Sequence, residues 1–285
     1  MKRRTFLSLI VPAAVLGGGC ALRPFHFIQM ADTQLGFIDG GKDGNNFTAE
    51  TEMLEKVMSG INHMEPVPAF VTVCGDMTNS AGHKGQIAEY KRLIGLIRPD
   101  ISCYQVSGNH DFKGKPTREN RALYAETYGP DRYWFERNGV MFIVLNSALI
   151  HEAKDCPEEA EAQWIWLKDV LAADRGAGKI GKVVFMHHLF FDRVIDEEDG
   201  YYAIPGESRR KYLDLFAEYG VYAVFSGHRH TTIPENSYRG IRLINTNAVC
   251  KSFDNNPGLR VVRVLPDGLH HEFYPYNRLP EKIIL

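Results

Sequence analysis

Four short polar runs, each directly after an apolar, β-branched stretch, constrain the possible fold of this chain more than any other feature. The runs are Asp32-Thr33-Gln34, Gly75-Asp76, Gly108-Asn109-His110-Asp111 and Gly227-His228-Arg229-His230. The stretches before them have the composition of buried strands, so each run is predicted at the C-terminal end of a strand. Loops at these ends share one edge of an α/β sheet, which is where ligands bind.

These polar runs also predict a metal site. With Met186-His187-His188, a further segment between the third and fourth runs, they bring carboxylates, an amide and several imidazoles to one edge. Two divalent ions about 3.5–4 Å apart need a bridging carboxylate, because its two oxygens offset the close positive charges. Asp76 stands alone at a strand end and suits that role, and Gly75 lets the backbone turn tightly beside it.

Length and charge narrow the class of protein. The chain has 285 residues and a formal net charge of −2. This length suits one large α/β domain or two small ones, and the lack of internal repeats or a low-complexity linker favours one. The near-neutral charge indicates no nucleic-acid partner, and the sequence does not indicate an oligomeric state.

Hydrophobic periodicity predicts alternating strands and helices along the chain. Helices are predicted over 48–63, 87–97, 118–128, 157–172 and 208–218. Asn138-Gly139 between two apolar runs predicts a β-hairpin. Strands are predicted over 25–30, 70–74, 101–106, 133–136, 140–145, 182–186, 221–225, 241–244, 259–265 and 270–274. These patterns alone indicate an α/β protein with a partly antiparallel sheet.

Residues 1–20 have the pattern of an export signal rather than of the folded domain. Arg3-Arg4-Thr5-Phe6-Leu7 resembles a twin-arginine signal, and the apolar run that follows is too short to span a bilayer. Leu16-Gly17-Gly18-Gly19-Cys20 resembles a lipobox, although Gly17 stands where a larger aliphatic residue is usual. The protein is therefore expected to be exported, either anchored to a membrane through acylated Cys20 or released into the periplasm after cleavage of a plain signal.

The other four cysteines show no metal-binding or redox spacing. Cys74 and Cys103 lie in apolar strand patterns and are expected to be buried. Cys156 and Cys250 could pair in an exported protein, and the sequence leaves their state open.

Several motifs follow one another in order along the expected domain, residues 21–285. The motifs are Ala31-Asp32-Thr33-Gln34-Leu35-Gly36-Phe37-Ile38, Cys74-Gly75-Asp76, Ser107-Gly108-Asn109-His110-Asp111, Leu145-Asn146-Ser147, Asp196-Glu197-Glu198-Asp199-Gly200-Tyr201-Tyr202, Phe225-Ser226-Gly227-His228 and Gly258-Leu259-Arg260-Val261-Val262. They resemble the calcineurin-like metallophosphoesterases, and among them the CPPED (calcineurin-like phosphoesterase-domain-containing) proteins, which are serine/threonine-type phosphatases. The resemblance implies a four-layer α/β/β/α sandwich of two mixed sheets.

The resemblance also implies two adjacent metal sites. Most of the superfamily has Asp-x-His in the first motif, whereas this chain has Gln34, a weaker donor that favours harder ions. Two divalent ions are therefore expected, drawn from Mn, Fe, Mg or Zn, with Mn favoured. Carried over by position, site one would contain Asp32, Gln34, Asp76 and His230, and site two Asp76, Asn109, His187 and His228.

Two further residues are implied to act beside the metals. In the family, the His at position 110 sits next to the phosphate, where it would assist the leaving oxygen, and Asp111 orients it. His187 and His188 compete for one ligand position, and His187 is preferred because it directly follows the strand. The acidic run Asp196–Asp199 and the two tyrosines after it fit a solvated loop at least as well as a substrate lid.

The function expected from this set is metal-dependent hydrolysis of a phosphorylated substrate by metal-activated water. No Ser or Cys is placed as a nucleophile, so no covalent intermediate is expected. Two alternatives stay open: a nucleotide or diester pyrophosphatase or phosphodiesterase, and a metal-binding surface protein without turnover. The filled ligand positions argue against the last.

Overall fold

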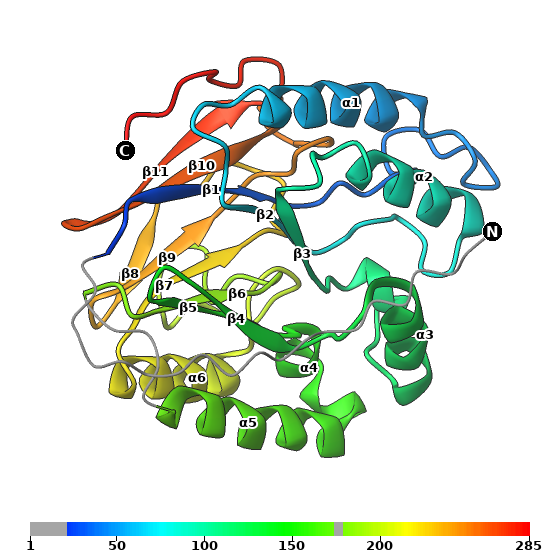
Figure 1. Cartoon of the computed structure of the whole chain (residues 1–285). Helices are drawn as coiled ribbons and strands as arrows, with labels where there is room; N and C mark the ends of the chain where they lie inside the picture. The colour runs from blue at the N-terminus through cyan, green and yellow to red at the C-terminus, as the bar shows by residue number, and fades with distance from the viewer. Residues whose placement is uncertain (1–21, 174–178) are drawn as a thin grey trace.

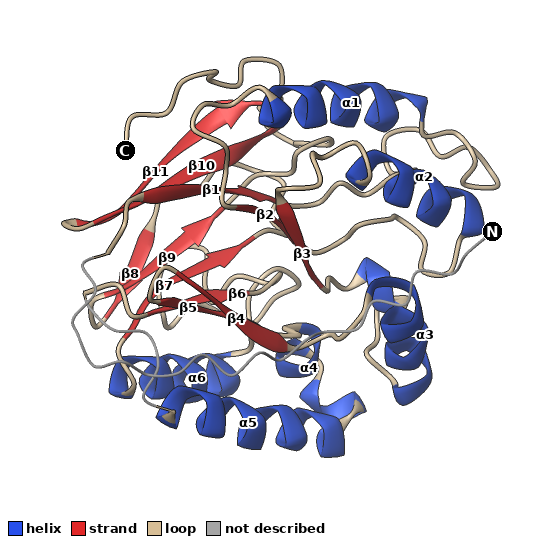
Figure 2. Cartoon of the chain, viewed as in Figure 1, coloured by secondary structure: helices blue, strands red, loops and turns tan. Residues whose placement is uncertain are grey.

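Two mixed β-sheets packed face to face, with helices on both outer sides, form the domain in the computed structural model (Figure 1). The structure describes residues 22–173 and 179–285. The expected export signal, residues 1–20 with Cys20, lies outside the described residues. Figure 2 shows the helices above and below the two sheets. The four-layer α/β/β/α sandwich is therefore confirmed.

The first sheet has the order β11-β10-β1-β2-β3. Its three neighbouring strands β1, β2 and β3 are parallel, and β10 pairs with β1 in the antiparallel direction. A mixed sheet results, with the carboxyl ends of its parallel strands at one edge. The strands are β1 (Phe25–Met30), β2 (Phe70–Cys74), β3 (Ser102–Val106), β10 (Gly258–Leu265) and β11 (Gly268–Pro275).

The second sheet has the order β4-β5-β6-β7-β9-β8. Its four central strands are parallel, and the strands at both edges are antiparallel to their neighbours. The hairpin between β4 and β5 turns at Asn138-Gly139, whose φ angles of 48° and 79° fit the expected tight turn. The strands are β4 (Tyr133–Arg137), β5 (Val140–Val144), β6 (Lys182–Phe185), β7 (Val221–Ser226), β8 (Asn236–Tyr238) and β9 (Ile241–Asn245).

Aromatic side chains fill the space between the sheets. Phe27 of β1 stacks on Phe70 of β2, with ring centroids 4.7 Å apart. Phe27 also meets Phe142, Phe185 and Phe225 of the opposite sheet edge-on, at centroid distances of 5.6 to 5.8 Å. Interdigitated rings of this kind fix the two sheets against each other and so fix the edge that they share.

The helices cover the outer faces in pairs (Figure 1). Apolar residues of α1 pack with β2 in one core, and those of α5 and α6 pack with β6 and β7 in another. The predicted helices are confirmed to within three residues at each end, whereas α4 and strand β8 were not predicted. The helices are α1 (Thr48–Asn62), α2 (Lys84–Ile94), α3 (Arg118–Tyr128), α4 (Ala148–His151), α5 (Pro157–Ala172) and α6 (Gly206–Glu218), with single 3-10 turns at His110–Phe112 and Ala153–Asp155.

The described residues show the state of the four cysteines of the domain and the character of its helices. Cys74, Cys103, Cys156 and Cys250 are all free thiols, so the structure contains no Cys156–Cys250 disulfide. None of the helices in residues 22–173 and 179–285 is long and apolar enough to cross a membrane.

Candidate metal centre

Five strand ends from both sheets deliver the expected ligands to one edge of the sandwich. Asp32 follows β1, Asp76 follows β2, Asn109 follows β3, His187 follows β6 and His228 follows β7. Backbone hydrogen bonds join neighbouring loops: the amide of Asp32 donates to the carbonyl of Gly75 at 3.1 Å. The site is therefore built from parallel strands that end together.

The backbone at these strand ends is left-handed. Five of the seven expected ligands have positive φ angles: Asp32 at 55°, Gln34 at 35°, Asp76 at 51°, His228 at 72° and His230 at 53°. Such angles are uncommon for residues other than glycine and cluster at functional sites. His228 and His230 lie beyond the end of β7, in the loop that follows it.

Two glycines make room for this arrangement. A Cβ atom on Gly75 would lie 2.2 Å from Nδ1 of His187, and one on Gly108 would lie 2.1 Å from Oδ1 of Asp76. Any larger residue at either position must displace a candidate ligand. The glycines of the motifs are thus required by close approach of the chain to the site.

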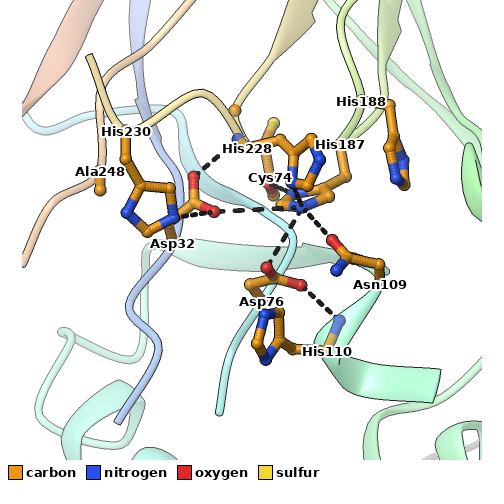
Figure 3. Close-up of polar contacts among 12 residues, drawn as sticks. Asp32, Cys74, Asp76, Asn109, His110, His187, His188, His228, His230 and Ala248 are labelled. Atoms are coloured by element: carbon orange, nitrogen blue, oxygen red, sulfur yellow. Dashed lines mark hydrogen bonds and ion pairs between the residues drawn. The ribbon is translucent and has the colours of Figure 1, made fainter. Parts of the chain in front are cut away.

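Four side chains converge on one point, as Figure 3 shows. Nε2 of His187 lies 3.1 Å from Oδ1 of Asn109, 3.1 Å from Nδ1 of His228 and 3.3 Å from Oδ2 of Asp76. The ligand atoms of Asp76, His187 and His228 all lie within 4.8 Å of one another. These four residues are the expected site two.

The expected site one lies next to this cluster. Nε2 of His230 is 3.1 Å from Oδ1 of Asp32, and that oxygen is 4.0 Å from Nε2 of His187. The backbone amide of Gln34 donates to the carbonyl of Asp76 at 2.8 Å. The side-chain oxygen of Gln34 is buried and accepts no hydrogen bond from the described part of the chain. An orphaned buried oxygen at this place fits a metal ligand.

Backbone carbonyls orient the three imidazoles of the centre. Nδ1 of His187 lies 2.8 Å from the carbonyl of Cys74, Nε2 of His228 lies 3.1 Å from that of Tyr201, and Nδ1 of His230 lies 2.6 Å from that of Lys251. A carbonyl only accepts, so the nitrogen that faces it carries hydrogen. The other nitrogen of His187 and of His230 lies near a carboxylate, and that of His228 lies near Nε2 of His187. A carbonyl on one nitrogen and the metal side on the other is the usual arrangement for metal-binding histidines.

The electrostatics of the cluster are those of a cation site. Burial alone would lower the pKa of His187, but the Asp76 carboxylate outweighs it and raises this pKa to about 9. Burial and the charge of His187 lower the pKa of His228 to about 3. Burial would raise the pKa of Asp76, but the nearby His187 outweighs this effect and holds the pKa of the Asp76 carboxyl well below its usual range. A buried carboxylate here therefore keeps its charge next to a positive neighbour, a place that a divalent cation can take.

The donor set fits hard-to-borderline divalent ions. It combines carboxylate oxygens, amide oxygens and imidazole nitrogens without any thiolate, since Cys74 contributes only its carbonyl. The sequence-predicted ligands Asp32, Asp76, Asn109, His187, His228 and His230 are brought together, and Gln34 joins them through its main chain.

His110 lies beside this cluster, but its partner differs from the expected one. Its backbone amide donates to Oδ1 of Asp76 at 2.9 Å, and its Nδ1 lies 2.8 Å from the carbonyl of Asn79. Asp111 does not orient the ring. Its carboxylate instead accepts from the amides of Asp76, Met77 and Gly108 at 2.8 to 3.2 Å. The expected pairing is wrong because a 3-10 turn points the two side chains apart.

His188 lies outside the ligand cluster (Figure 3). Its Nδ1 is 2.9 Å from Oγ of Ser147, and its ring stacks on His151 at 4.7 Å. Burial and the nearby His228 lower the pKa of His188 well below its usual value. His188 is therefore a neutral side chain that lines the cavity beside the centre. This agrees with the choice of His187, rather than His188, for the ligand position.

A cavity of about 480 Å³ opens beside the centre. Asn109 and His110 border it on the metal side, and Lys113, His151 and Tyr201 line other parts of it. A cavity of this size accommodates a small organic group.

Sequence patterns did not identify two contributors to the site. Asn79 and Tyr201 act through main-chain carbonyls, on His110 and His228 respectively. The only available signal for Tyr201 was its position in the acidic motif, which fitted a solvated loop equally well.

A buried carboxylate–imidazole–amide cluster at the shared edge of a two-sheet sandwich defines a metal-dependent hydrolase. The family model described as calcineurin-like phosphoesterase matches residues 25–232, and the chain belongs to this family. The resemblance inferred from the motifs is confirmed, and the protein is a phosphoesterase of the hydrolase class.

A curated relative and two solved structures agree with this assignment. The chain is 33% identical over 270 residues to the serine/threonine-protein phosphatase CPPED1 of Bos taurus, covering 91% of this chain and 86% of that protein. Purple acid phosphatase PPD1 from Lupinus luteus seeds superposes with a TM-score of 0.63 at 14% identity, covering 90% of this chain and 52% of that one. A dimetal phosphatase from Danio rerio superposes with a TM-score of 0.59 at 14% identity, covering 88% of this chain and 99% of that one. These structural likenesses confirm the fold.

Gln34 offers a direct test of site one. Gln34→Ala should weaken Mn²⁺ binding at site one and leave site two, built on Asn109, His187 and His228, largely occupied. Gln34→His should tighten the first ion and shift preference toward Zn²⁺, because imidazole suits softer ions better. Calorimetric titration of the wild type and both variants measures this. Equal stoichiometry and affinity in wild type and Gln34→Ala would show that Gln34 is not a ligand.

Proposed function

We propose that this protein is a dinuclear phosphoesterase in which Asp76 bridges two divalent ions, with Mn²⁺ the favoured metal. The observation that carries the proposal is the convergence of Asp76, Asn109 and His228 on Nε2 of His187, within 3.3 Å. Asp32, Gln34 and His230 would complete the first site. When bound, the two ions activate a water for attack at phosphorus and offset charge on the phosphoryl oxygens.

The residues around the ions divide the remaining tasks. Hydrogen bonds to backbone carbonyls hold the three imidazoles with their inward nitrogens toward the site. His110 supplies a proton to the leaving oxygen, and the cavity that it borders receives the leaving group. Asp111 fixes the loops that carry Asp76 and Gly108 through three amide hydrogen bonds.

A comparison of two chromogenic substrates tests the proposal. With Mn²⁺ added, p-nitrophenyl phosphate should be hydrolysed, and a chelator should abolish the activity. Preference for bis-p-nitrophenyl phosphate would favour the diesterase alternative. Metal binding without turnover of either substrate, or of phosphoserine, would favour a non-catalytic metal-binding protein.

We also propose that the protein is exported and held on a membrane through Cys20. The pattern of Arg3-Arg4, the short apolar run and the small residues before Cys20 support it. More than one acyl chain is needed for stable anchoring, which lipoprotein processing would provide.

Changing Cys20 tests this anchor. Cys20→Ser should move the protein from the membrane fraction to the soluble exported fraction, because the acylation site is lost. Cys156→Ser removes a thiol of the folded domain and should leave the protein on the membrane. Fractionation of expressing cells measures the distribution, and equal solubility of the wild type and Cys20→Ser would refute the anchor.

A further inference from the structure

Tyr201 contacts two of the expected metal ligands at once. Its hydroxyl accepts a hydrogen bond from Nδ2 of Asn109 at 3.0 Å, and its carbonyl oxygen lies 3.1 Å from Nε2 of His228. Its ring also lies against the His228 ring, with centroids 4.9 Å apart. Asn109 and His228 both belong to the second metal site, so one residue holds two of its ligands.

The contact to Asn109 decides which end of the amide faces the site. A carboxamide has a donor end and an acceptor end, and only the oxygen can bind a metal. With Nδ2 turned to Tyr201, Oδ1 faces Nε2 of His187 at 3.1 Å. Without the tyrosine hydroxyl, the amide can rotate and present nitrogen instead.

The contact to His228 decides which ring nitrogen is free. The carbonyl of Tyr201 requires hydrogen on Nε2, which leaves the lone pair on Nδ1 of the neutral ring. Nδ1 is the nitrogen that lies 3.1 Å from Nε2 of His187. Tyr201 thus fixes the tautomer of His228 as well as the orientation of Asn109.

The loop that carries Tyr201 is anchored before it. The carboxylate of Glu197 accepts hydrogen bonds from the amides of Asp192 and Arg193 at 2.7 and 2.9 Å. Asp199 accepts from the amide of Gly206 at 2.7 Å, which ties the loop to the start of α6. Tyr201 therefore stands on a segment with its own internal framework.

The buried side chain of Arg209 forms hydrogen bonds to the same loop. Arg209 of α6 has no exposed surface. Its guanidinium donates to the carbonyls of Ile195, Glu197 and Ile204 at 2.5, 3.1 and 3.0 Å. Such a planar donor set joins three separate points of one loop.

We propose that Tyr201 is a positioning residue of the second metal site, acting through Asn109 and His228 from a loop fixed by Arg209. The inference rests on the metal centre proposed above, and it adds a second layer of contacts around that centre. Outer partners of this kind typically change metal affinity about 10- to 100-fold when they are removed.

Tyr201→Phe tests the hydroxyl while it keeps the ring and the carbonyl. The variant should bind Mn²⁺ at the second site about 10-fold more weakly in calorimetry, with binding at the first site unchanged. Tyr202→Phe is the matched control. The Tyr202 ring also lies near His228, at 5.4 Å, but no hydrogen bond from its hydroxyl is found among the described residues. Tyr202→Phe should bind as the wild type does.

A double-mutant cycle separates positioning from a general structural effect. Asn109→Asp has an oxygen at both ends of the side chain and needs no orientation. Tyr201→Phe should therefore lose its effect on Mn²⁺ affinity in the Asn109→Asp background. A 10-fold loss that persists there would overturn the proposed route through Asn109.

The remaining outcomes distinguish this inference from the proposed function. Wild-type protein that binds two equivalents, with Tyr201→Phe binding identically, would overturn the role of Tyr201 and leave the metal centre intact. Wild-type protein that binds no Mn²⁺ would overturn both. Weakened second-site binding that Asn109→Asp makes independent of Tyr201 would establish it.

Discussion

Asp76→Asn should reduce the rate of p-nitrophenyl phosphate hydrolysis by on the order of 10³-fold. This loss corresponds to about 4 kcal/mol of transition-state stabilisation. Oδ1 of Asp76 accepts a hydrogen bond from the backbone amide of His110, whereas Oδ2 lies 3.3 Å from Nε2 of His187. In the variant, the amide oxygen must satisfy His110. The NH₂ group then takes the position of Oδ2, where it has no lone pair for a metal.

Glu50→Gln provides a matched control for this loss. Glu50 is a buried acid whose Oε1 accepts both the Gly36 and Ile38 amides, at 3.1 and 2.8 Å. Glutamine keeps that oxygen, so the control replaces one buried carboxyl group by an amide without removing an expected metal ligand, and its activity should be that of the wild type. Full activity in Asp76→Asn, or in chelator-treated wild type, would contradict the two-metal mechanism.

The strands and the edge they share could be predicted from the sequence. The run 140–144 is apolar at every position, and the run 70–74 is apolar except at Thr72; this is the pattern of strands buried on both faces, and the structure confirms both. A polar residue directly after such a run can only stand at a strand end. This reasoning places Asp32, Asp76 and Asn109 together without any knowledge of three-dimensional contacts.

The orientation of the ligands could not be predicted in the same way. Left-handed backbone at Asp32 and His228 could not be inferred from residue type, because Asp and His adopt it more often than most other residues but still uncommonly. The carbonyls that orient the imidazoles, from Cys74, Tyr201 and Lys251, belong to every residue type equally. Each of these carbonyls lies far along the chain from the ring that it contacts, so the contact depends on the three-dimensional course of the loops and could not be predicted from the residue types.

Asp111 shows a related limit. The family resemblance implied that Asp111 orients the ring of His110. A 3-10 turn at His110–Phe112 instead directs the carboxylate toward three amides of the neighbouring loops. Local spacing predicted which residues are present at the site but not which of them touch.

His110→Asn should slow hydrolysis of phosphoserine by about 10²-fold or more, because a positioned proton donor typically contributes that much. Nδ1 of His110 lies 2.8 Å from the carbonyl of Asn79, so Nε2 is the nitrogen left to exchange a proton with substrate. The asparagine NH₂ group can still donate to that carbonyl, but nothing replaces Nε2. Measured kcat for the variant and the wild type gives the loss.

The leaving group separates proton donation from other roles of this ring. p-Nitrophenolate departs readily as an anion, so His110→Asn should slow p-nitrophenyl phosphate far less than phosphoserine. His63→Asn is the control, since Nδ1 of this exposed histidine also bonds a carbonyl, that of Ser59 at 2.7 Å, and its loss should leave both rates unchanged. If His110→Asn slowed both substrates equally, the ring would act by holding charge or structure at the centre, and the proton for the leaving oxygen would have to come from water.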